Sequence, residues 1–162
     1  MSRYGRRVIT LRRATVEDAP GVADVFLTSF HSTYDFPLAH EDDDVRGWVR
    51  DRLIPTMETW VAVDASLDGM PVVGMMAVGP GQLEQLYVAP DRLGVGIGRR
   101  FVDLAKERSP DGLSLWTFQV NARVRRFYER NAFVAVEFGD GSTNEEARPD
   151  VRYQWTPGSV SG

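Results

Sequence analysis

Apolar residues recur along this chain with two periods, one typical of helices and one typical of strands. Residues 15–18 form a helix start of the capping-box type, and the apolar residues after it follow helical spacing: Val22, Val25, Phe26 and Phe30. Residues 41–54 predict a second helix, which has an acidic first turn and an inward face of Val45, Trp48, Val49 and Leu53. The first third of the chain therefore predicts two helices.

Strand-like runs surround and follow these helices. Residues 8–12 are typical of an edge strand, and three runs separated by turn signals predict an antiparallel meander: 59–63, 72–78 and 83–88. The meander leads into a glycine-rich turn and then a helix with inward Ile97, Phe101, Leu104 and Ala105.

The rest of the chain alternates strand and helix. A strand over residues 113–120 precedes a short helix with Val124, Phe127 and Tyr128 on its apolar side, and two strands follow at 133–138 and 152–156. This order predicts one α/β domain over residues 1–162, with flexible ends at 1–7 and 157–162. Its central sheet is mixed and mostly antiparallel, with about seven strands flanked by about four helices.

Composition narrows the classes of function. The 162 residues include no cysteine, which excludes disulfides, thiolate nucleophiles and iron–sulfur clusters. His31 and His40 are the only histidines, so we expect no metal centre. The net charge of −4 argues against nucleic-acid binding, and no stretch approaches the ~20 apolar residues of a membrane span. We expect a cytoplasmic protein whose mature chain begins near Met1.

The glycine-rich turn carries the strongest local chemical signal. A strand ends near Val88, and Gly94, Gly96 and Gly98 then lead directly into a helix. Free backbone N–H groups and the positive end of a helix dipole favour an anion there, such as a pyrophosphate. The spacing differs from the dinucleotide fingerprint and from a P-loop. A turn that merely connects strand to helix remains the alternative.

A second segment strengthens the functional interpretation. Residues 115–133 contain a strand, Asn121 and a helix with the run Phe127-Tyr128-Glu129. Together the two segments, from about residue 83 to 133, resemble the GNAT superfamily of acetyl-coenzyme-A-dependent N-acyltransferases.

Two departures from the family pattern stand out. Leu93 replaces the usual Gln or Arg, so a cofactor contact is either missing or supplied by Arg92. Ala132 replaces a glycine, which costs about 1 kcal/mol in a left-handed conformation unless Asn131 takes that conformation instead.

The resemblance implies acetyl-CoA as co-substrate and assigns the residues that would hold it. The pantetheine arm would pair with the backbone of Leu86, Tyr87 and Val88, and Asn121 would bond the cofactor near the second helix. The pyrophosphate would rest on one continuous run: Gly94, Val95, Gly96, Ile97, Gly98 and Arg99.

The same resemblance makes Tyr128 the general acid. A phenol with a pKa near ~10 is protonated at neutral pH and can give its proton to a leaving thiolate. The alternative is a tyrosine that only fills the core. Glu84, two residues before Leu86, is the candidate general base acting through water, and a structural ion pair is its alternative.

The expected function is an N-acetyltransferase that moves acetyl to a primary amine by direct attack. Two acidic segments, residues 35–44 and 140–150, favour a small cationic acceptor. The alternative is that these carboxylates cap helices, pair with Arg148 and Arg152, or keep the chain soluble. The alternatives are a non-catalytic acyl-CoA-binding or sensing domain and an acetyltransferase of peptide amino-termini. The expected partners are a small-molecule or peptide amine, neither nucleic acid nor membrane, with a homodimer left open.

Overall fold

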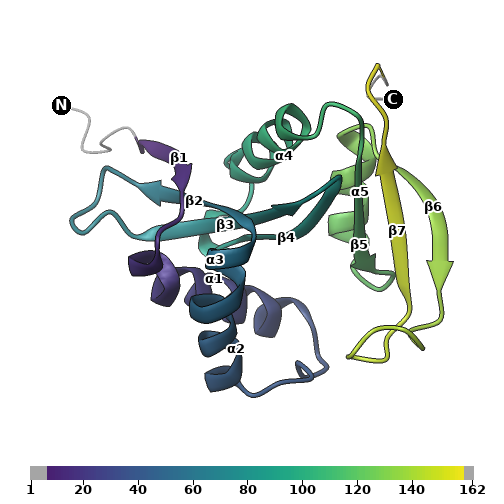
Figure 1. Cartoon of the computed structure of the whole chain (residues 1–162), viewed down its shortest axis with the longest axis horizontal. Helices are drawn as coiled ribbons and strands as arrows, with labels where there is room; N and C mark the ends of the chain where they lie inside the picture. Colours follow the sequence, from purple (N-terminus) through teal and green to yellow (C-terminus); the bar gives the residue numbers. More distant parts are fainter. Residues whose placement is uncertain (1–6, 159–162) are drawn as a thin grey trace.

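The computed structural model describes residues 7–158, which form a seven-stranded sheet with helices on both faces (Figure 1). The strands are β1 (Ile9–Arg13), β2 (Glu58–Asp64), β3 (Val72–Gly79), β4 (Gln82–Val88), β5 (Leu113–Phe118), β6 (Val134–Gly139) and β7 (Asp150–Trp155). The helices are α1 (Ala19–Thr33), α2 (Asp42–Trp48), α3 (Ile54–Thr56), α4 (Ile97–Arg108) and α5 (Ala122–Arg130). The expected flexible ends lie almost wholly outside the described residues.

The sheet has the strand order β1-β2-β3-β4-β5-β7-β6, which confirms the predicted mixed architecture. Every neighbouring pair is antiparallel except β4 and β5, which are parallel. The parallel pair requires a crossover, and α4 provides it.

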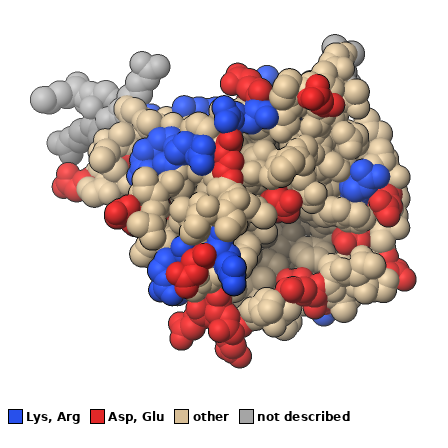
Figure 2. Space-filling view, in the orientation of Figure 1, with Lys and Arg blue, Asp and Glu red and all other residues tan. Residues whose placement is uncertain are grey.

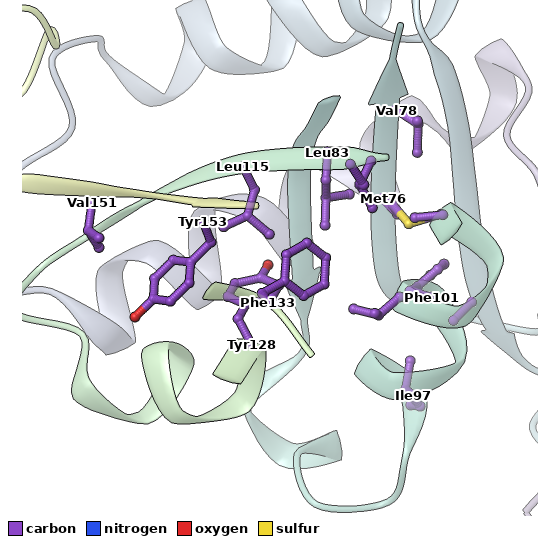
Figure 3. Packing of buried hydrophobic residues seen from close by; sticks show 14 of the residues in the cluster. Met76, Val78, Leu83, Ile97, Phe101, Leu115, Tyr128, Phe133, Val151 and Tyr153 are labelled. Carbon is purple, nitrogen blue, oxygen red and sulfur yellow. The ribbon is translucent and has the colours of Figure 1, made fainter. Parts of the chain in front are cut away.

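Each face of the sheet has its own apolar core. On one face α1, α2 and the π-helical turn Val49–Leu53 pack against β2 and β3. On the other face α4 and α5 pack against β3, β4, β5 and β7. In Figure 3 the rings of Tyr128, Phe133 and Tyr153 lie together beneath Leu115, with Phe101 of α4 nearby. The helices that carry the predicted site are thus fixed by core packing.

The parallel pair is short. Strands β4 and β5 are paired at Gln82 and Ser114, and the Ser114 N–H donates to the Gly81 carbonyl at 3.0 Å. Beyond this point the strands take different directions, so that β2, β3 and β4 run across Figure 1 while β5, β7 and β6 run down it. The sheet is therefore open between β4 and β5.

Two local predictions were wrong. Trp48 does not face inward; it is 36% exposed because it lies at the edge of the α1–α2 contact, with its ring centroid 6.2 Å from that of Phe26. The strand that begins at Leu113 ends at Phe118, because residues 119–121 turn into α5. Of the two alternatives left open for the left-handed residue after α5, the structure has Ala132 itself (φ 70°), whereas Asn131 has φ −102°.

Candidate active site

A cleft of about 440 Å³ occupies the opening between β4 and β5. Its walls come from the end of α1, from β4 and β5, from the glycine-rich turn and from α5. Every residue that the sequence predicted for the site lines this cleft except Val95. Val95 is 54% exposed and lies outside the lining of the cleft.

The backbone of β4 presents polar groups to the cleft. The Ala89 N–H donates to Val73 O at 2.9 Å, and Tyr87 lies opposite Met75 in the same register. Because antiparallel pairs alternate, Tyr87 bonds toward β3, while the N–H and C=O groups of Leu86 and Val88 point toward the cleft. The Ser29 hydroxyl donates to Val88 O at 3.0 Å. The backbone groups of Leu86 and the Val88 N–H thus remain available to an extended ligand.

The three glycines of the turn serve different purposes. Gly94 and Gly96 have φ values of 81° and 89°, a left-handed conformation that L side chains rarely adopt, and Gly96 caps α4. Gly98 is favoured by packing instead, since a Cβ there would lie 3.2 Å from Phe127 Cζ on α5, a tight contact. The first turn of α4 leaves the N–H groups of Ile97 and Gly98 free of helical partners, which suits an anion.

Arg92 anchors this turn to the sheet. Its Nη1 lies 2.5 Å from Oδ2 of Asp64 at the end of β2, and the two side chains are 12% and 1% exposed. Hydrogen bonds from Ser66 and then from Arg92 lower the Asp64 pKa to about 2. One end of the Arg92 guanidinium is therefore held by Asp64, while the residue also lines the cleft, so a contact from Arg92 in place of the side chain missing at Leu93 stays a prediction.

Tyr128 belongs both to the core and to the cleft. It is 6% exposed, and its ring centroid lies 5.2 Å from that of Phe127 and 5.5 Å from that of Phe133. Its hydroxyl has no hydrogen-bond partner among residues 7–158, although the residue lines the cleft. Burial and the neighbouring Tyr34 raise the Tyr128 pKa. The hydroxyl is protonated at neutral pH and free to meet a ligand.

Tyr34 is a site residue that sequence reasoning missed. It follows α1 and lines the cleft, and its hydroxyl accepts a hydrogen bond from Asn121 Nδ2 at 2.9 Å. The Asn121 Oδ1 accepts from the Val124 N–H at 3.1 Å and so caps α5. Asn121 therefore fixes the start of α5 against the end of α1. The partners are 87 residues apart in the chain, and no local pattern connects them.

Glu84 lies on β4 beside a register shift and lines the cleft. Burial raises its pKa. Within the described part of the chain it forms no salt bridge, so the structural ion-pair alternative is wrong there. An unpaired, half-buried carboxylate is suited to accept a proton at moderate pH.

Charges are distributed unevenly around the cleft. Four arginines line it, namely Arg92, Arg99, Arg123 and Arg130, and Glu84 is the one carboxylate among its described lining residues. Figure 2 shows a hollow right of centre with acidic side chains around its edge. Part of the expected acidic rim is paired: Asp42 with His31 at 3.1 Å and Glu145 with His40 at 2.7 Å.

The described residues contain no group of three or more His, Cys, Asp or Glu side chains that could hold a metal ion. Within the same residues, no helix is long and apolar enough to cross a membrane.

Comparison with known proteins gives one family. The model of the acetyltransferase (GNAT) family matches residues 20–133. The peptidyl-lysine N-acetyltransferase YjaB of Escherichia coli (strain K12) is 28% identical over 126 residues, covering 78% of this chain and 82% of that protein. The peptidyl-lysine N-acetyltransferase YiaC of the same strain is 27% identical over 128 residues, covering 78% and 84%.

Solved structures share the fold. The solution structure of apo-form YjaB from Escherichia coli superposes with a TM-score of 0.74 at 24% identity, covering 91% of this chain and 97% of that one. The structure of yncA, a putative acetyltransferase from Salmonella typhimurium with its cofactor acetyl-CoA, has a TM-score of 0.69 at 15% identity and covers 96% and 97%.

Proposed function

The chain belongs to the GNAT family of acetyltransferases, and from that premise we propose that it moves acetyl from acetyl-CoA to a primary amine by direct attack. The observation that supports this most is the cleft between β4 and β5, where the unpaired edge of β4, the cap of α4 and the free hydroxyl of Tyr128 meet. We take residues 1–162 as one such domain, located in the cytoplasm.

The cleft fits the chemistry of acetyl-CoA. A Cβ built on Gly94 or Gly96 meets no atom within 4 Å, so open space lies directly beside the turn. Helix N–H groups at Ile97 and Gly98, with Arg99 beside them, would hold the pyrophosphate. The exposed N–H and C=O groups of β4 would pair with the amides of the pantetheine arm.

Acyl transfer forms a C–N bond and breaks a C–S bond, and the protein must manage two protons. The Leu86 or Val88 N–H would donate to the thioester carbonyl oxygen as that oxygen gains charge. Glu84 would take a proton from the attacking amine through water, and Tyr128 would give its proton to the departing thiolate. The enzyme is restored when a proton passes from Glu84 back to Tyr128 through solvent.

Two observations support a proposal for the acceptor. The relatives described above are named peptidyl-lysine N-acetyltransferases, and acidic side chains lie around the hollow that Figure 2 shows. We propose a cationic primary amine, either a small molecule or a lysine side chain in a peptide. A free peptide amino-terminus is the second candidate within the same chemistry.

An acceptor panel monitored by release of free CoA tests the proposal. The panel contains an amino-terminally blocked peptide with one lysine, an unblocked peptide without lysine, and a small polyamine. We expect turnover with the first or the third. Binding of acetyl-CoA without turnover on any amine would favour the non-catalytic alternative, and preference for the second would identify an amino-terminal acetyltransferase.

A further inference from the structure

The chain contains very few side-chain amines. Its 162 residues contain eighteen arginines and a single lysine, Lys106. A guanidinium with a pKa above 12 keeps its proton and does not attack a thioester. Lys106 is therefore the one side-chain amine of this sequence that acetyl transfer could modify.

The Lys106 side chain is half-buried, and its amine contacts three other residues. Lys106 lies in the last turn of α4, and its Nζ donates a hydrogen bond of 2.6 Å to the main-chain oxygen of Asn131. The Nζ is also 5.5 Å from the ring centroid of Phe133 and 5.3 Å from that of Trp155. A carbonyl and two aromatic rings thus lie beside the nitrogen that would have to attack.

The same contacts stabilise a strained helix end. Asn131 follows α5, and its carbonyl is one of the groups that a helix end leaves without a partner. The next residue, Ala132, has φ 70°, where a glycine would be favoured. Lys106 therefore joins α4, which begins at the glycine-rich turn, to the end of the helix that carries Tyr128. Acetylation would remove the positive charge of Lys106, which helps to hold α4 against the end of α5.

We propose that the folded protein shields Lys106 from acetyl transfer, so that it carries no lysine that its own acetyl donor can modify. The relevance to acetyl-CoA rests on the proposed function, whereas the shielding itself rests on the contacts of Nζ. Burial lowers the Lys106 pKa, which by itself would make the amine more nucleophilic. The protection must therefore come from the carbonyl and the rings, since the charge state does not supply it.

Competitive labelling with acetic anhydride tests the shielding without any enzyme activity. The Arg50→Lys variant supplies an internal reference, because Arg50 lies on the surface with a side chain 59% exposed. Peptide mapping should show Lys106 acetylated at least about tenfold more slowly than the introduced lysine, since a charge-assisted hydrogen bond and cation–π contacts must open first. In urea the two rates should converge. Equal rates in the folded protein would overturn the proposal.

A second variant identifies the source of the protection. Trp155→Ala removes one ring from beside Nζ and leaves the Asn131 carbonyl in place, so Lys106 labelling should rise several-fold while circular dichroism reports whether the fold persists. No rise in a folded variant would show that the ring does not shield the amine. Prolonged incubation of the wild-type protein with acetyl-CoA should leave Lys106 unmodified by mass spectrometry. An inactive protein would fail the acceptor panel yet still show slow anhydride labelling, so the two failures are distinguishable.

Discussion

Replacing Tyr128 with phenylalanine removes one oxygen and its proton from the cleft. The ring contacts with Phe127, Phe133 and Tyr153 would remain, because they involve ring atoms alone. The hydroxyl has no partner among the described residues, so its loss leaves no donor or acceptor unpaired. We therefore expect the free energy of unfolding to change by less than about 1 kcal/mol.

The effect on turnover should be much larger. Loss of a general acid typically costs about 10²–10⁴-fold in rate, which corresponds to about 2.7–5.4 kcal/mol of activation free energy. Because burial and Tyr34 raise the Tyr128 pKa, the wild-type hydroxyl stays protonated into the alkaline range, and no loss of activity from its ionisation is expected below pH ~10. Steady-state release of CoA gives kcat, and calorimetry gives the affinity for acetyl-CoA, which should not change.

Tyr153→Phe is the matched control, because Tyr153 belongs to the same core but its hydroxyl is fully engaged. That hydroxyl accepts from Arg125 Nε at 3.1 Å and donates to Glu129 Oε2 at 2.8 Å. Its removal should lower stability by about 1.5 kcal/mol or more and leave kcat nearly unchanged. If Tyr128→Phe keeps kcat within about threefold of wild type, or if both variants lose activity equally, Tyr128 is not the general acid.

Three further substitutions test other parts of the site. Glu84→Gln should reduce activity most at the lower end of the pH range, where the acceptor amine is protonated, and least as pH approaches the pKa of that amine near ~10.4. An equal loss of activity at every pH would show that Glu84 is a positioning residue. Asp64 has a folded pKa of about 2 against 3.8, so its stabilising contribution is complete above pH 3.8 and is lost as pH falls toward 2. The melting temperature of Asp64→Asn should therefore depend less on pH in that window, and CoA affinity should fall as the turn held by Arg92 loosens; an unchanged pH dependence would contradict the ion pair. Gly96→Ala places an L side chain at a residue with φ 89° and should weaken CoA binding. The control Gly81→Ala, at φ 66° in the β3–β4 turn, should lower stability and leave CoA affinity intact. Equal CoA affinity in both variants would show that Gly96 does not belong to the anion site.

Local signals predicted most of the architecture. The spacing of Val22, Phe26 and Phe30 identified α1, and alternating apolar runs identified the meander β2–β4. These patterns are reliable because each residue's environment depends mainly on the periodicity of its own element. The inward face of the second helix was predicted less well, since Trp48 lies at a packing edge that no periodicity reveals.

The candidate site also has parts that the sequence could predict and parts that it could not. The glycine-rich turn and the helix with Tyr128 are contiguous in sequence, so their chemistry could be predicted from spacing and from family resemblance. The contacts that position them are not contiguous. Asp64 meets Arg92 across 28 residues, and Tyr34 meets Asn121 across 87. Pairings of this kind arise only when the sheet brings distant segments together.

The sequence by itself predicted the order of elements and the mixed sheet, because these depend on periodicity and turn residues, and its resemblance to the GNAT family predicted acetyltransferase chemistry. The tertiary structure alone decided that β4 and β5 separate after Gln82 and Ser114, that Arg92 pairs with Asp64, and that Ala132 takes the left-handed conformation. Each of these depends on the packing free energy of elements far apart in the chain. That free energy outweighs local preference and does not follow from any one segment.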